Sequence, residues 1–344
     1  LQLSSYRTLK DEYDDKYEYI LPAITFNKNL FNEEFGYGNF KTNLKVHNYD
    51  TNKSKKFIIN DFDWSFNNLL SSTPYEGKFL TKIKNVNYEV KNEDKFKQDT
   101  TSDFFGALGF LANLDLYKKE GEDINHLLSP KMLIRYSPNH MRKETGDHSL
   151  LGKDIFSLDR LNVSENFESG TNMTLGFNYQ REKKANSMNF SMGQIINANE
   201  TNKKMPSSSS LDKRFSDVVG NFNFSNNKNL NLNYDYSLKQ NYEELNFSEI
   251  SADYKNNNFK FDLSYLKDDI IGGEKEYFKT KLELKKGVNG VFAFSNKRNL
   301  ITNASEYYDL SYEYINDCLR AGLVYRREFY NDSELEPDNT LMFT

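Results

Sequence analysis

Alternation of apolar and polar residues constrains the fold of this chain more than any other feature. Over residues 230–238 the even positions are Leu or Tyr, and the odd positions are Asn, Asp or Ser. Successive side chains of a β-strand point to opposite faces, whereas a helix cannot place all five even positions on one face. This stretch therefore predicts a strand with one apolar face and one polar face.

The same alternation recurs along most of the chain. It is clear in the second half and noisier in the first. In each stretch, aromatic or aliphatic residues occupy one parity, which we expect to face hydrocarbon. The stretches are 62–66, 86–90, 108–116, 173–179, 259–265, 308–314 and 321–329.

Placing boundaries at the polar clusters predicts about 18 strands, each long enough to cross a bilayer at the usual tilt, for which about 9–11 residues suffice. Residues 226–228, 255–258, 286–289 and 316–317 read as tight turns, whereas the connections 138–170 and 197–216 are long. Short turns on one rim and long loops on the other are typical of outer-membrane barrels. The expected segments are 1–9, 18–27, 37–49, 57–67, 77–91, 104–117, 127–137, 171–181, 185–196, 217–226, 229–238, 245–255, 258–268, 275–285, 289–299, 304–315, 318–330 and 338–344.

Composition removes several other classes of protein. No stretch approaches the roughly 18 uncharged apolar residues of a membrane helix, and 15% aromatic content argues against disorder. The net charge of −5 does not suit a nucleic-acid partner. A soluble β-protein remains an alternative to a barrel, but such a fold gives no reason for short turns to lie at one end of the strands and long loops at the other. Tyrosines near the apolar ends of many strands also favour a membrane-interface girdle. No domain boundary is evident within 1–344.

Catalytic and metal chemistry find little support. His140, Glu144, Asp147 and His148 share one long connection, but they lack a recognised ligand spacing, and we read them as solvated loop residues. His47 is the nearest candidate for a Ser-His pair, and a rim histidine is the favoured interpretation. We therefore predict a protein that is not an enzyme, with no cofactor and no metal.

Two prolines and one cysteine need separate interpretation. Pro22 and Pro130 interrupt strand-like segments, where each removes a ladder donor and marks a strand end, a bulge or a locally weakened sheet. Cys318 follows a tight turn on the short-turn rim. If that rim faces the periplasm, the unpaired thiol indicates a partner outside this sequence; a buried free thiol is the alternative.

Three stretches of the sequence carry recognisable motifs. They are 129–139 (SPKMLIRYSPN), 154–161 with 169–176, and 316–327 (NDCLRAGLVYRR) followed by 341–343. The first resembles a strand and its exit, the second a long loop and returning strand, and the third the penultimate and final strands of the LptD (OstA) family of LPS-assembly outer-membrane proteins.

The resemblance implies that residues 1–344 are the C-terminal part of a 26-stranded antiparallel transmembrane β-barrel in the outer membrane of a Gram-negative bacterium. The first strands and the family's N-terminal β-jellyroll would lie outside this sequence. The barrel would take lipopolysaccharide from a periplasmic bridge through that N-terminal domain and insert it into the outer leaflet. An LptE-like plug lipoprotein would sit in the lumen, with outer-membrane lipids around the wall.

The resemblance also assigns roles to residues. Cys318 matches a barrel cysteine that forms a disulfide with the N-terminal region, although Asp317 stands where some members carry a second cysteine. Lipopolysaccharide would leave through a lateral seam between the first and last strands. The last strand here comprises Asp338, Asn339, Thr340, Leu341, Met342 and Phe343. Another kind of outer-membrane transport barrel, a porin or a receptor-type channel, is the alternative function.

Overall fold

The computed structural model describes residues 1–8, 16–67, 69, 74–138, 140–226, 229–287, 289–329 and 339–343. Twenty strands form one sheet, and the two helices in these ranges are short 3₁₀ turns. No helix in the described part of the chain has the length and hydropathy of a membrane span. The strands are β1 Gln2–Arg7, β2 Tyr17–Asn32, β3 Gly36–Tyr49, β4 Ser54–Phe66, β5 Tyr75–Lys91, β6 Thr101–Leu114, β7 Leu116–Glu120, β8 Ile124–Ser137, β9 Gly170–Lys183, β10 Asn186–Thr201, β11 Lys213–Phe215, β12 Val218–Asn226, β13 Leu230–Leu238, β14 Leu245–Lys255, β15 Phe259–Asp268, β16 Lys275–Lys286, β17 Gly290–Asn299, β18 Ala304–Ile315, β19 Arg320–Glu328 and β20 Asn339–Phe343, with η1 at Gly152–Asp154 and η2 at Ser207–Ser209.

Each strand pairs antiparallel with its neighbours, and pairing runs without a break from β1 to β20. Strands β6 and β7 lie end to end, and both pair with β8. In the same way, the short β11 and the longer β12 both pair with β10. All of the expected segments overlap a strand, so the predicted all-β antiparallel fold is confirmed. Within the described ranges, β1 and β20 are the two edges, and no backbone pairing joins them.

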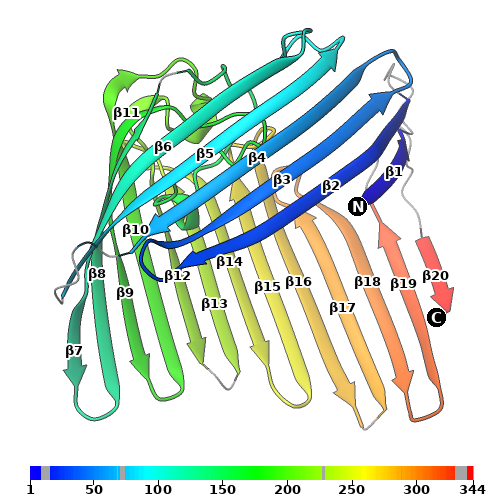
Figure 1. Cartoon of the computed structure of the whole chain (residues 1–344). Helices are drawn as coiled ribbons and strands as arrows, with labels where there is room; N and C mark the ends of the chain where they lie inside the picture. Colours follow the sequence, from blue (N-terminus) through cyan, green and yellow to red (C-terminus); the bar gives the residue numbers. More distant parts are fainter. Residues whose placement is uncertain are drawn as a thin grey trace.

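The sheet curves strongly, with β2–β6 in front of the more distant β13–β16 (Figure 1). The tight turns between β12 and β13, β14 and β15, β16 and β17, and β18 and β19 lie at the lower end of the view. The long connections after β8 and β10 gather at the opposite end, on the upper left. The predicted segregation of connection lengths is therefore confirmed.

The convex face carries most of the predicted apolar rows. Leu108 in β6, Leu175 in β9, Ile250 in β14 and Phe292 in β17 are all exposed there. Large aliphatic and aromatic side chains left exposed over so many strands suit contact with hydrocarbon, as in an outer-membrane barrel.

One predicted apolar row faces the other way. Val86, Tyr88 and Val90 of β5 are buried on the concave face, not turned outward to lipid. The outward positions at this end of β5 are Asn85 and Asn87. The alternation was read correctly, but the face was wrong, because these apolar side chains pack against a chain segment folded inside the sheet.

Candidate functional site on the concave face

The connection between β8 and β9 folds onto the concave face. Its Leu158 and Phe167 join a buried cluster with side chains of β4, β5, β6 and β8. Its Met141, Leu150 and Ile155 pack with Ile195 of β10 and with the β10–β12 connection in a second cluster. The interpretation of His140, Glu144, Asp147 and His148 as solvated loop residues is wrong for Glu144, which is 2% exposed, because the connection packs against the sheet and fills one half of the interior.

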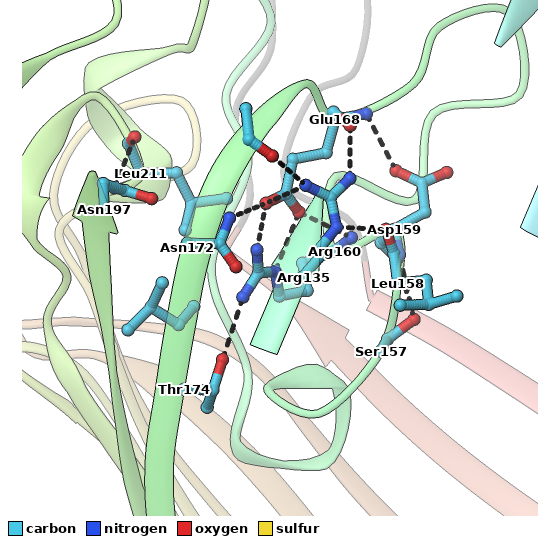
Figure 2. A network of polar contacts seen from close by, with 12 residues as sticks. Arg135, Ser157, Leu158, Asp159, Arg160, Glu168, Asn172, Thr174, Asn197 and Leu211 are labelled. Atoms are coloured by element: carbon cyan, nitrogen blue, oxygen red, sulfur yellow. Dashed lines mark hydrogen bonds and ion pairs between the residues drawn. The ribbon is translucent and has the colours of Figure 1, made fainter. Parts of the chain in front are cut away.

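A buried charged cluster fixes the connection to the wall (Figure 2). Arg160 and Glu168 belong to the connection, and Arg135 belongs to β8; none is more than 2% exposed. Arg160 Nε donates to Glu168 Oε2 over 2.8 Å, and its Nη2 contacts Glu168 Oε1. Arg135 Nη1 lies 3.6 Å from Glu168 Oε1. The single carboxylate of Glu168 therefore forms ion pairs with two buried guanidinium groups.

The other guanidinium nitrogens of both arginines also have hydrogen-bond partners. Arg135 donates to the carbonyl oxygens of Leu158, Glu168 and Gly170. Arg160 Nη1 donates to Thr174 Oγ1 of β9 over 3.2 Å. Burial alone would raise the pKa of Glu168, but the charges of Arg135 and Arg160 lower it, so the carboxylate stays ionised.

Lys84 of β5 extends this cluster. Its Nζ lies 3.3 Å from Asp159 Oδ2 and donates to the carbonyl oxygens of Val163 and Asn166. Asp159 Oδ1 accepts the backbone N–H of Glu168 over 3.2 Å. The connection is thus attached to β5, β8 and β9 through buried polar groups whose hydrogen bonds are satisfied, as buried charges require.

Glu144 attaches the start of the connection in a similar way. Burial would raise its pKa, but hydrogen bonds from Lys95, Asn166 and the Gly146 N–H lower it to about 2. His148 Nε2 lies 3.8 Å from Glu144 Oε1. No group of three or more His, Cys, Asp or Glu side chains within the described ranges is placed to hold a metal.

Two of the other three histidines, His140 and His47, also have structural neighbours. The ring of His140 stacks on Phe105 with 5.4 Å between centroids. His47 of β3 lies 3.0 Å from Glu18 of β2.

The concave face of β13–β19 differs from the filled half. Its rows are polar and charged, with Asp309 paired to Arg326 and Lys281 paired to Glu283. These side chains are partly exposed, so this half of the interior is polar, as the sequence predicted.

The predicted seam strand is β20, where Asn339 to Phe343 pair with β19; Asp338 lies outside the described residues. Five residues form β20 and six form β1. Apart from β7 and β11, the other strands of the described chain have nine residues or more.

Both prolines lie at irregularities of the sheet. Pro22 falls within the register shift between Ile20 and Ala23 in the β2–β3 pairing. Pro130 of β8 lies where pairing with β6 gives way to pairing with β7. Proline lacks the backbone N–H that donates in a sheet, and it is typically found at such irregularities.

Cys318 lies in the tight turn between β18 and β19, and its thiol is exposed and free. Its backbone N–H donates to Asn316 Oδ1 over 3.0 Å, which holds the turn. The turn between β18 and β19 lies at the same end as the other tight turns (Figure 1), as the sequence indicated.

Sequence reasoning missed the buried cluster. Arg135 and Glu168 are 33 residues apart, and neither was singled out. The available signal was an arginine inside the apolar segment 127–137, where a charged side chain needs a buried partner.

A large curved antiparallel sheet with apolar outward rows, a partly polar interior and long loops at one rim is typical of outer-membrane β-barrel proteins. The model of the LptD family, LPS transport system D, matches residues 1–280, and the chain belongs to this family. A search of the curated proteins found no match. The family assigns the chain a role in lipopolysaccharide transport at the outer membrane, with lipopolysaccharide as the substrate.

Proposed function

We propose that this chain inserts lipopolysaccharide into the outer leaflet through a lateral seam, one side of which is β20. The observation that supports the proposal is that β20, within the described residues, pairs on one side alone, through five residue pairs with β19. Few ladder hydrogen bonds make an edge easy to open, and acyl chains need such an opening because a polar lumen does not accommodate them. The polar concave face of β13–β19 suits the sugar portion.

A photo-crosslinking amino acid in place of Leu341 tests the seam in cells. Leu341 is an exposed residue of β20, so we expect it to form a covalent adduct with lipopolysaccharide. Ile250 is the matched control, since it is an exposed convex-face residue of the central strand β14. Adducts of equal yield at both positions, or at neither, would remove the seam from the proposal.

Depletion of the protein tests transport separately from the seam. Loss of surface lipopolysaccharide on depletion, together with equal adducts at Leu341 and Ile250, would keep the transport role and reject β20 as the exit.

We further propose that residues 1–344 act as the C-terminal part of the barrel, with a disulfide from Cys318 to an N-terminal domain and a plug lipoprotein in the lumen. The exposed, unpaired thiol supports the disulfide. Non-reducing electrophoresis of the full-length protein purified from membranes should show a mobility change on Cys318→Ser, and a co-purifying lipoprotein band. Identical mobility would exclude the disulfide, and the absence of a second band would exclude the plug.

A further inference from the structure

Two lysines lie directly opposite each other on the concave face of neighbouring strands. Lys279 of β16 pairs in register with Lys297 of β17. Like charges directly opposite one another across a sheet destabilise the pairing. In the wall of a polar interior, an anion beside the two lysines would compensate their repulsion.

The protein supplies that anion for Lys297 only. Lys297 Nζ lies 2.7 Å from Glu306 Oε2 and 4.1 Å from the centroid of the Tyr277 ring. Lys279 is exposed and has no carboxylate partner among the described residues. Its other cross-strand neighbour, Ser264 of β15, is uncharged.

Nearby lysines on the same face are paired. Lys281, two residues along β16, lies 2.7 Å from Glu283, and Lys260 of β15 lies 2.9 Å from Asp262. The positive charge of Lys279 is therefore a local excess and not part of a balanced network.

The surroundings of Lys279 suit an oxyanion that carries hydroxyl groups. Ser264 and Ser251 continue its row across β15 and β14 to Asn233 of β13, which donates to Ser251 Oγ over 3.2 Å. The row thus places the Ser264 hydroxyl beside an unpaired ammonium in the middle of a strand, with Ser251 and Asn233 further along the same row.

We propose that Lys279 is the centre of a site for a phosphate ester on the concave face. The ammonium of Lys279 contacts the anion directly, while the charge of Lys297 opposite it is already balanced by Glu306. The proposal rests on the proposed function, in which the phosphorylated sugar portion of lipopolysaccharide passes this wall. Binding at this site is a separate property from release at the seam.

Titration of the full chain in detergent micelles tests the site, with glucose 6-phosphate as the probe and its ³¹P NMR signal as the readout. We expect saturable binding that Lys279→Gln weakens at least fivefold. Lys281→Gln is the matched control, because it removes the same charge from the same strand and face at a paired position; we expect it to change the affinity less than twofold. Glucose and inorganic phosphate are the comparison ligands.

The outcomes separate clearly. Binding of inorganic phosphate as tight as that of glucose 6-phosphate supports the anion site and assigns no contact to the sugar; tighter binding of glucose 6-phosphate adds the serine row. If both lysine variants weakened binding equally, the effect would come from the net charge of the protein, and the proposal would be overturned. The absence of saturable binding to the wild-type chain would overturn it as well.

Lys279→Glu gives a further check on folding, since a glutamate there faces Lys297 and should preserve the sheet while abolishing binding. The Leu341 adducts test the seam independently of all these results.

Discussion

Glu168→Gln is expected to lower the free energy of unfolding by about 3–5 kcal/mol, the cost of leaving buried charges without their partner. The glutamine keeps the shape of the side chain but removes the charge that two buried guanidinium groups share. The β8–β9 connection should then separate from the wall. Urea unfolding in micelles gives the stability, and limited trypsin digestion within 141–168 reports release of the connection.

Glu89→Gln is the matched control for that experiment. Glu89 forms a partly exposed ion pair with Lys56, 3.3 Å apart, so its loss should cost under about 1 kcal/mol. If the two variants were equally stable, or if trypsin cut them at equal rates, the buried cluster would not be what holds the connection.

Phe105→Ala should cost about 3–5 kcal/mol, because it removes a buried ring and leaves a cavity between β6 and the connection. Phe105 is 2% exposed, and its ring lies 6.3 Å from that of Phe167. The measurement is again urea unfolding in micelles.

The adjacent Phe104 provides the control, since it is the same residue type on the opposite face and is 63% exposed. In the Phe104→Ala variant, lipid or detergent fills the space that the ring occupied. The loss is then limited to the free energy of transferring the ring out of water, about 1–2 kcal/mol. A Phe104→Ala variant less stable than Phe105→Ala would show that the packed interior lies on the convex face instead.

Most of the fold was predictable because it depends on local alternation. The pattern from Leu230 to Leu238 places β13, since a strand is the only regular structure that puts those five residues on one face. The polar clusters around Asn226 and Asn316 place the turns for a similarly local reason. The short β7 was not separated from the segment 104–117, and β11 lies within the predicted long connection 197–216, because so short a strand leaves little trace in sequence.

The candidate site was much less accessible to sequence reasoning. β20 and Cys318 were located, because one belongs to a strand and the other to a tight turn, and both are local features. The Arg135–Glu168 pair was not found, because nothing local to β8 indicates which of the 50 acidic residues of the chain meets its arginine.

The amino-acid sequence by itself determined that this protein is an antiparallel sheet of transmembrane type, because alternation and turn residues act over a few neighbouring positions. Only the tertiary structure decided what each face contacts. Val86 and Val90 leave water when they contact lipid and equally when they pack against a folded connection. The hydrophobic free energy is favourable in both cases, so it does not decide which of the two they contact. Which half of the interior is filled and which stays polar therefore depends on where residues 138–170 fold back, a choice made by side chains far apart in the chain.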